Sequence, residues 1–381
     1  MSAEPRSYDT IVVGLGAMGS AALYHLARRG QRVLGLEQFS QGHAFGSSHG
    51  DSRIIREQYF EHPLYVPLVQ RAFQLWRELE QVTYRPLMTI TGGLMIGPPD
   101  GSVVTGTLRS AKEHGLAHAL LSADEVHSRF PAFAPVRGLV GAWDPRAGVL
   151  DADACNAAHV DAARSKGAET HFEEAVGTWK ADDDGVRVTT ARATYRADRM
   201  VLAAGPWTSE LARDLDLPLA IERETLFWFD PVEDTAPYDS KSFPIFCYEY
   251  TPGKICFGVS RTSHGVKAGI HHSGDFVMHP DDLKRGVDPS EVDAVREALR
   301  PVLPGLSTAP VRDAAVCVYT NTPDDNFIVD WHPRHRNVLI ASPCSGHGFK
   351  FAAVLGEVQA DLLMTGPSAF DISPFRIDRF R

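Results

Sequence analysis

Apolar residues near the start of the chain fall into short runs separated by glycine, a pattern typical of a strand, a helix and a second strand. The run Thr10–Val13 is continuous and largely β-branched, as in a strand that is buried on both faces. Residues Ser20–Arg29 have helical composition, and Gly30 ends this helix. Residues Arg32–Glu37 then predict a second strand. Together these segments predict a β-α-β unit.

A glycine-rich turn joins the first predicted strand to the helix. Gly14, Gly16 and Gly19 form the pattern Gly-x-Gly-x-x-Gly, and Glu37 ends the second strand 18 residues after Gly19. Gly14 permits a tight turn, Gly16 lets the backbone approach a pyrophosphate, and Gly19 lets the helix pack against the strand. The start of the helix attracts the pyrophosphate, and Glu37 accepts hydrogen bonds from the adenosine ribose. The unit therefore predicts dinucleotide binding.

Similar patterns predict further elements along the rest of the chain. Helices are expected over Leu64–Leu79, over Asp153–Ser165 and from about Lys350 to Met364. Buried strands are expected at Arg199–Gly205 and Asn337–Ala341, and a hairpin around Asp182–Gly185. Aromatic residues and short strands between residues 218 and 320 indicate a separate β-rich lobe.

The first and the last predicted strands both lead into a glycine-rich turn and a helix. A nucleotide-binding domain assembled from distant segments, with the other lobe inserted between them, accounts for this arrangement. We therefore predict an α/β fold in which an FAD-binding Rossmann-like domain is interleaved with a β-rich (α+β) substrate domain. The expected boundaries are residues 1–85, 150–217 and 318–381 for the FAD-binding domain, and 86–149 and 218–317 for the substrate domain.

Composition narrows the class of protein further. Apolar residues make up 44% and charged residues 23% of the 381 positions, a balance typical of a globular chain with a sizeable core. The net charge of −10 provides no overall electrostatic basis for binding nucleic acid or an anionic membrane. We therefore expect neither of these partners.

Cysteine usage and the amino terminus indicate a reducing compartment. The five cysteines include no Cys-x-x-Cys pair, so we expect no disulfide scaffold and no bound metal, neither zinc nor haem. The amino terminus carries Glu4, Arg6 and Asp9 where a secretory signal has an apolar run. Uninterrupted apolar stretches stay well below the roughly 18 residues of a membrane-spanning helix. The expected location is the cytoplasm.

Five segments spread from one end of the chain to the other carry a family resemblance. They are the glycine turn at 14–19, Gly46–Arg56 (GSSHGDSRIIR), Leu202–Trp207 (LAAGPW), Ala315–Asp330 (AVCVYTNTPDDNFIVD) and Ser345–Lys350 (SGHGFK). In these segments the chain resembles the monomeric sarcosine oxidase family, which includes N-methyltryptophan oxidase and related N-alkyl amino acid oxidases. The resemblance implies FAD as cofactor, a small amino acid as substrate, dioxygen as electron acceptor, and a monomer.

Cys317 lies where this family attaches FAD through a thioether to a methyl group of the flavin ring, so the resemblance implies covalent FAD at Cys317. A thiolate is a reasonable nucleophile for such a reaction when cations lie nearby. The alternative is a buried core thiol, which is the common environment of a free cysteine. Cys344, next to Ser345, is a second candidate, although it aligns with a position that is not the linkage residue.

The resemblance also assigns charged residues to the substrate and to the flavin. Arg56 and Lys350 are implied to bind the substrate carboxylate, for which a planar guanidinium and an ammonium are suited. The alternative is a pair of solvated surface cations. Arg53 and His49 resemble residues beside the flavin ring, where positive charge stabilises the reduced anionic flavin. Asp51 is expected to be a structural partner of these cations.

Lys267 and His271 are the further catalytic residues that the resemblance implies. Lys267 corresponds to the lysine that activates dioxygen in this family, an electrostatic role in which a cation stabilises developing superoxide. His271 resembles a histidine of the substrate pocket, with the adjacent His272 as the alternative. A structural role is the other interpretation for either histidine.

Two further positions bear on the cofactor and on the choice of substrate. Gly346, His347 and Gly348 are implied to contact the cofactor, with His347 shaping the turn and hydrogen-bonding near the flavin. Phe257 departs from the family pattern, because sarcosine oxidases have a pocket tyrosine there. The missing hydroxyl removes a hydrogen-bonding group, which favours a larger or more apolar N-alkyl amino acid, or a cyclic imino acid.

These inferences predict a flavin-dependent oxidase of a secondary amino acid. The product is an imine that hydrolyses to an aldehyde and an amine, while dioxygen is reduced to hydrogen peroxide. The alternatives are a dehydrogenase of the same fold that passes electrons to a quinone or a carrier, and a cyclic imino acid oxidase. A flavin-binding module without catalysis and an NAD-dependent dehydrogenase are more distant alternatives.

Overall fold

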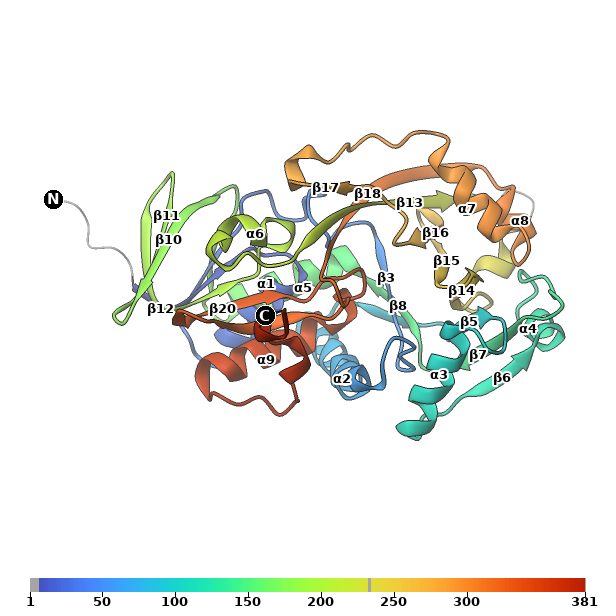
Figure 1. The fold of residues 1–381 in the computed structure, drawn as a ribbon, viewed down its shortest axis with the longest axis horizontal. Helices are drawn as coiled ribbons and strands as arrows, with labels where there is room; N and C mark the ends of the chain where they lie inside the picture. The colour runs from blue at the N-terminus through green and yellow to red at the C-terminus, as the bar shows by residue number, and fades with distance from the viewer. Residues whose placement is uncertain (1–6, 232–233, 381) are drawn as a thin grey trace.

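Two large β-sheets lie one after the other along the long axis of the molecule (Figure 1). The structure is a computed structural model, and it describes residues 7–231 and 234–380. Glu4 and Arg6, on which the argument about a secretory signal depends, lie outside these residues. Within the described ranges, no helix has both the length and the apolar character that crossing a membrane requires.

The first sheet has eight strands, and its central part is parallel, as expected for a dinucleotide-binding domain. Parallel pairing gives the order β9-β2-β1-β12-β20. These strands are β1 (Ser7–Val13), β2 (Val33–Leu36), β9 (Glu169–His171), β12 (Thr194–Leu202) and β20 (His335–Ser342). The antiparallel strands β10 (Val176–Asp182), β11 (Gly185–Thr190) and β19 (Ile328–His332) complete the sheet. β10 and β11 form the predicted hairpin.

Four helices share a hydrophobic core with this sheet. They are α1 (Ala17–Ala27), α2 (Val66–Thr83), α5 (Ala152–Ser165) and α9 (Ala352–Met364), close to the four helices that the sequence predicts. α1 packs against both α5 and α9, and almost all of its residues are buried. It begins three residues earlier than predicted, because Gly16 already serves as its N-cap.

Close approaches of the backbone explain two glycines of the turn between β1 and α1. Gly14 has a φ of 88°, in the left-handed region, and a Cβ there would lie 2.5 Å from the carbonyl oxygen of Ala203. A Cβ at Gly19 would lie 1.8 Å from the carbonyl oxygen of Gly14. Both positions therefore require glycine, Gly14 for the turn and Gly19 for the packing of α1 on β1.

The second sheet has nine strands and forms the β-rich lobe, with the order β17-β13-β16-β15-β14-β5-β7-β6 and with β18 paired to β13. Its strands are β5 (Gly93–Gly97), β6 (Ala119–Ser122), β7 (Val140–Asp144), β13 (Ala220–Phe229), β14 (Ile245–Thr251), β15 (Lys254–Thr262), β16 (Gly265–His271), β17 (Phe276–Val277) and β18 (Val311–Asn321). The expectation of short strands is wrong for β13 and β18. These two pair antiparallel from Ala220 with Asn321 to Phe229 with Val311, and β13 is buried along almost its whole length.

A small third sheet contains β3 (Ser52–Ile55), β4 (Met88–Ile90) and β8 (Gly148–Asp151). β18 runs across the expected domain boundary at residues 317 and 318, and its end is tied to the turn after β20 by a hydrogen bond of 2.9 Å from Ser345 N to Thr320 O. The domain boundaries therefore stay a prediction.

The other helices are α3 (Ser102–Glu113), α4 (Ala123–Arg129), α6 (Thr208–Leu211), α7 (Glu291–Leu299) and α8 (Pro304–Ser307), with 3₁₀ turns at Pro63–Tyr65, Gly205–Trp207, Arg213–Leu215, Ala236–Tyr238, Pro280–Asp282, Phe349–Phe351, Ser373–Phe375 and Ile377–Phe380.

Candidate active site

A cavity of about 400 Å³ is lined by residues of both large sheets, a volume typical of small-molecule and cofactor sites. The glycine turn, the loop after β2, strand β3, the strands β15, β16 and β18 and the turn after β20 all contribute to its wall. The sequence-predicted residues that line it are Gly14, Gly16, Glu37, Arg53, Arg56, Phe257, Lys267, His271, Cys317, Gly346, His347, Gly348 and Lys350. Gly19 and His49 are buried behind the wall.

One end of the cavity offers groups that suit the diphosphate and the ribose of FAD. Gly16, the N-cap of α1, and Ala17, whose backbone N donates to Ser48 Oγ at 2.9 Å, bring the start of this helix to the cavity, and a helix N-terminus attracts phosphate. Glu37 is buried, and its carboxylate accepts hydrogen bonds from Leu15 N at 2.8 Å and from Phe39 N at 3.1 Å. Ser47 also lines the cavity, and its buried Oγ has no hydrogen-bond partner among the described residues. These donors and acceptors fit FAD.

Three cysteines line the cavity, and they differ in their charged neighbours. Cys317 lies on β18, where Nη2 of Arg53 donates to its Sγ at 3.6 Å. Burial raises the pKa of both Cys247 and Cys344 to about 11, so both are thiols at neutral pH. Contact with a guanidinium thus distinguishes Cys317 from Cys344 as a candidate nucleophile.

The expectation of a positive charge at His49 is corrected by the structure. Burial and the adjacent Arg53 lower the pKa of His49 to about 4. His49 is therefore neutral at neutral pH. Its backbone instead holds Arg53, whose Nη2 donates to the carbonyl oxygens of His49 at 2.6 Å and of Ser47 at 2.9 Å. Asp51 also differs from the expectation, since its carboxylate accepts a hydrogen bond of 3.0 Å from Thr262 rather than pairing with either predicted cation.

Lys267 lies on β16 and reaches the start of β3 and the residues just before it. Its Nζ donates to the carbonyl oxygens of Gly50 at 2.8 Å and Ser52 at 2.5 Å, and to Ser52 Oγ at 3.3 Å. Nζ also lies 5.5 Å from the centre of the Trp228 ring. Burial and the nearby Arg53 hold the pKa of Lys267 well below its usual range. The three oxygen acceptors fix the position of this amine in the cavity wall.

Arg56 is buried between two aromatic rings and a carboxylate. Its Cζ lies 4.2 Å from the centre of the Tyr59 ring and 4.1 Å from that of Phe60. Its Nη2 donates to both carboxylate oxygens of Glu61, at 2.5 and 2.6 Å. Burial disfavours both charges, but the ion pair outweighs it, raising the pKa of Arg56 and lowering that of Glu61. Arg56 is therefore not a solvated surface cation. In the free site its guanidinium is paired with Glu61, so a substrate carboxylate has to compete with Glu61 for it.

Lys350 lies beside Arg56, against the same Tyr59 ring. Its Nζ donates to His347 O at 2.8 Å and to Tyr59 Oη at 3.4 Å. His347 Nε2 faces the carbonyl oxygen of Asp325 at 2.9 Å and must donate, so Nδ1 accepts from Tyr59 Oη at 2.6 Å. This neutral ring agrees with the pKa of His347, which burial lowers to about 4. Burial and Arg56 together lower the pKa of Lys350 to about 7.

His271, rather than His272, lines the cavity. Its Nδ1 lies 3.1 Å from the hydroxyl of Tyr319 on β18, and burial beside His272 lowers its pKa well below the usual range. His272 instead contacts Glu222, with 2.8 Å between Nδ1 and Oε2. Of the two alternatives left by the sequence, His271 is the one placed to contact a ligand.

A second polar cluster lies behind these histidines on β13. Burial and the neighbouring Glu222 raise the pKa of Glu224 to about 8. With His272, the two carboxylates bring ligand atoms within 4.8 Å of one another, an arrangement that could hold a metal ion. Glu222 already accepts from Asn321 Nδ2 at 2.6 Å, and Glu224 from Ser273 N at 3.0 Å. The expectation of no bound metal stays a prediction.

Comparison with known families decides the class of protein. Residues 9–362 match the family model described as DAO, FAD dependent oxidoreductase. The chain belongs to this family. Relatives of this FAD-dependent oxidoreductase include a monomeric sarcosine oxidase of Streptomyces avermitilis, 42% identical over 97% of both chains. An N-methyl-L-tryptophan oxidase of Salmonella dublin is 34% identical over 98% of this chain and 99% of its own. The predicted resemblance to the monomeric sarcosine oxidase family is confirmed.

Solved structures confirm the predicted fold class of this FAD-dependent oxidoreductase. NikD, described as an unusual amino acid oxidase essential for nikkomycin biosynthesis, is 27% identical, covers 98% of each chain and has a TM-score of 0.84. An L-proline dehydrogenase from P. horikoshii also has a TM-score of 0.84, at 20% identity over 99% of this chain and 98% of its own. The second likeness concerns the fold alone.

The sequence reasoning missed several residues of the cavity region, among them Tyr59, Glu61 and Tyr319. Tyr319 follows Cys317 by two positions on β18, and alternate residues of a strand face the same side, so this spacing could have identified it. Tyr59 and Glu61 follow β3 in an irregular segment. No periodicity marks the side chains of such a segment.

Proposed function

We propose that this FAD-dependent oxidoreductase oxidises a secondary amino acid, N-methylated or N-alkylated, to an imine that hydrolyses to an aldehyde and an amine, with dioxygen reduced to hydrogen peroxide. At the level of a flavin-dependent amino acid oxidase, the prediction is confirmed by curated relatives named monomeric sarcosine oxidase and N-methyl-L-tryptophan oxidase. The observation that carries the proposal is the meeting of Arg56 and Lys350 at Tyr59, in the same cavity as Cys317 and Lys267. The relatives' own names also support a monomer.

FAD, when bound, supplies the acceptor for the two electrons of the substrate C–H bond and passes them to dioxygen. In the proposal, the Glu37 carboxylate accepts hydrogen bonds from the hydroxyls of the adenosine ribose, and the start of α1 holds the diphosphate. Arg56 and Lys350 bind the substrate carboxylate and so orient the carbon next to the nitrogen. Phe257 supplies an apolar surface for the N-alkyl group.

The charges around His271 also favour a neutral substrate amine. Burial, His272, His347, Lys350 and Arg56 all contribute to the low pKa of His271. The same burial, together with the nearby cations Arg56 and Lys350, disfavours an ammonium ion beside His271, since like charges raise the cost of a second cation. An amine that has lost its proton keeps its lone pair available to stabilise the imine that forms.

We expect Cys317→Ser to abolish covalent attachment of the flavin, because the variant lacks the sulfur that Arg53 contacts. Acid-precipitated wild-type protein should retain its yellow colour in the pellet, whereas the colour of the variant should pass into the supernatant. Cys344→Ser, which changes another cavity cysteine, is the control and should keep its colour in the pellet. If Cys344→Ser released the colour and Cys317→Ser kept it in the pellet, the flavin would instead be attached to Cys344.

Binding of a carboxylate that lacks an amine, such as propionate, is expected to weaken above about pH 7. The pKa of Lys350 lies at about 7 in the free site, so the site loses one of its two cations as the pH rises through that value. The anion prefers the protonated form, so its affinity is complete below this pKa and falls by up to about tenfold per pH unit above it. Titration followed by flavin absorbance between about pH 6 and about pH 9 measures this change.

Lys350→Arg provides the matched control for the pH profile, since a guanidinium keeps its charge over this range. The variant should bind propionate with nearly constant affinity. A wild-type affinity that is equally constant would contradict the assignment of Lys350 to the carboxylate.

A screen for peroxide release tests the proposed function directly. N-methyl, N-alkyl and cyclic amino acids are supplied to the aerated holoenzyme, and peroxide is followed with a coupled peroxidase. Because Phe257 offers no hydroxyl, the highest activity is expected with an apolar N-alkyl group or a cyclic imino acid. Substrates that bleach the flavin under argon without releasing peroxide in air would favour the dehydrogenase alternative.

A further inference from the structure

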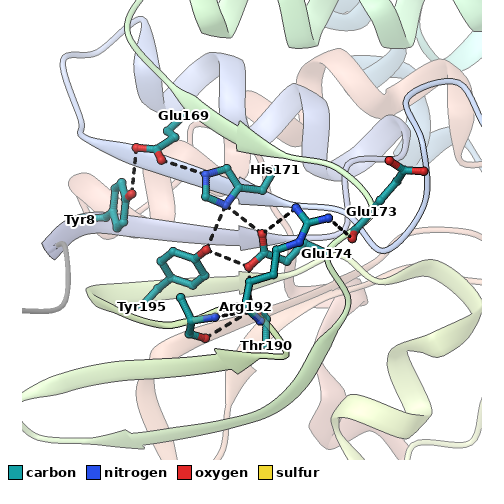
Figure 2. Close-up of polar contacts among 9 residues, drawn as sticks. Tyr8, Glu169, His171, Glu173, Glu174, Thr190, Arg192 and Tyr195 are labelled. Carbon is teal, nitrogen blue, oxygen red and sulfur yellow. Dashed lines mark hydrogen bonds and ion pairs between the residues drawn. The ribbon is translucent and has the colours of Figure 1, made fainter. Parts of the chain in front are cut away.

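The buried carboxylate of Glu174, beside the end of the cavity proposed for the adenosine of FAD, contacts residues of three strands (Figure 2). Glu174 lines the cavity although only 4% of its surface is exposed. Its carboxylate accepts hydrogen bonds from Thr190 Oγ1 at 2.6 Å and from Tyr195 Oη at 2.8 Å. His171 Nδ1 lies 3.1 Å and Arg192 Nη1 lies 3.5 Å from it. Burial opposes the charge, but these partners outweigh it and lower the pKa of Glu174.

Backbone hydrogen bonds join this segment to the one that carries Glu37. Glu37 N donates to His171 O at 2.9 Å, and Glu174 N donates to Glu37 O at 2.8 Å. Glu173 N donates to Phe39 O at 3.0 Å. The main chain on both sides of Glu37 is therefore fixed to residues 171–174. We therefore expect a displacement of Glu174 to shift the backbone that carries the Glu37 carboxylate.

The backbone between these contacts is strained. Glu173 has a φ of 55°, a left-handed conformation that a residue with a side chain keeps only where its surroundings impose it. Arg192 Nη2 donates to the carbonyl oxygen of Glu173 at 2.9 Å, while its Nη1 faces the Glu174 carboxylate. The residues that follow the turn, Ala175 and Val176, line the cavity. The turn thus places the backbone of Ala175 and Val176 in the cavity wall.

We propose that Glu174 is a positioning residue for the adenosine half of FAD. Its carboxylate, in the cavity wall, holds the left-handed turn at Glu173 through Arg192, which contacts both residues. This turn positions the backbone of Ala175 and Val176 at the cavity. Through the hydrogen bonds at residues 37–39, it also positions the carboxylate of Glu37. The inference rests on the placement of the ribose at Glu37 proposed above. Since only the adenosine half meets these groups, Glu174 discriminates between FAD and FMN.

The experiment compares FAD with FMN on apoprotein of the Cys317→Ser chain, obtained from riboflavin-starved cells. Quenching of tryptophan fluorescence gives the two dissociation constants, and it reports the reversible step even if a covalent bond forms later elsewhere. Glu174→Ala removes the acceptor of several charge-assisted hydrogen bonds, so we expect FAD to bind about tenfold or more weakly. FMN, which lacks the adenosine half, should bind within about twofold of the parent.

Glu169→Gln is the matched control, because Glu169 contacts Nε2 of His171 at 2.8 Å, the ring nitrogen opposite the one that faces Glu174. It should leave both dissociation constants within about twofold. If Glu174→Ala does not fold, Thr190→Val removes one donor to the same carboxylate and should weaken FAD alone, by about threefold.

The outcomes separate this inference from the proposal on which it rests. Equal weakening of FAD and FMN would reduce Glu174 to a general structural residue, and an unchanged FAD affinity would overturn the inference. Glu37→Gln is measured alongside. If Glu37→Gln weakens FAD while Glu174→Ala does not, only the role of Glu174 fails. If neither variant weakens FAD, the placement of the ribose at Glu37 fails as well.

Discussion

Lys267→Met should slow reoxidation of the reduced flavin by dioxygen about 10²–10³-fold, the range seen when one preorganised electrostatic group is removed from an active site. The amine of Lys267 is fixed by Gly50 and Ser52 in the cavity wall. Burial beside Arg53 holds its pKa low in the free site. Negative charge that develops on dioxygen nearby favours the protonated form again, and methionine fills a similar volume without offering that charge.

Stopped-flow spectroscopy separates the two half-reactions of this variant. Flavin reduction by substrate under argon should remain within about threefold of the wild-type rate, because the proposal assigns the substrate carboxylate to Arg56 and Lys350 and not to Lys267, whose amine donates to Gly50 and Ser52. Lys254→Met is the matched control, as Lys254 is an exposed lysine at the start of β15. It should leave both half-reactions unchanged. Equal slowing of reduction and reoxidation in Lys267→Met would remove its role with dioxygen.

Arg56→Ala should raise the dissociation constant of a carboxylate substrate about 100-fold or more, as expected when one partner of a desolvated, hydrogen-bonded charge pair is removed. Two effects add in this variant. The substrate loses a bidentate donor, and Glu61, deprived of the cation that lowers its pKa, is left close to the incoming carboxylate. The affinity is obtained from the substrate dependence of flavin reduction under argon.

Glu61→Gln tests the same site in the opposite direction. A neutral amide frees the Arg56 guanidinium for the substrate and removes a competing anion, so the affinity for carboxylates should increase about three- to tenfold. The dissociation constant of an amine that lacks a carboxylate should be unchanged in both Arg56→Ala and Glu61→Gln. If Arg56→Ala left the dissociation constant unchanged, the carboxylate would have to bind elsewhere in the cavity.

The parts of the fold that could be predicted are those with a local signal. The glycine turn, the first strand and the helix after it follow from spacing within about 30 residues, and both Gly14 and Gly19 have the close contacts that this spacing implies. The lengths of β13 and β18 could not be predicted in the same way. They depend on pairing between residues about 90 positions apart, such as Glu224 with Cys317, which no local pattern records.

The candidate site shows the same division. The family resemblance located Arg56, Lys350 and Cys317, but it could not indicate that Glu61 neutralises Arg56 or that burial makes His49 neutral. Protonation states depend on the sum of burial and charge at a folded position. They therefore become visible only once the chain is arranged in space.

The long ladder between β13 and β18 has a consequence for how substrate enters and leaves. β18 belongs to the β-rich sheet, yet its end is hydrogen-bonded to the turn after β20. A hinge rotation that separated the two lobes would have to disrupt these bonds, unlike the hinges that open between weakly joined domains. Access to the cavity is therefore expected to depend on side chains and short loops, with the exchange of Arg56 between Glu61 and a ligand as the smallest such movement.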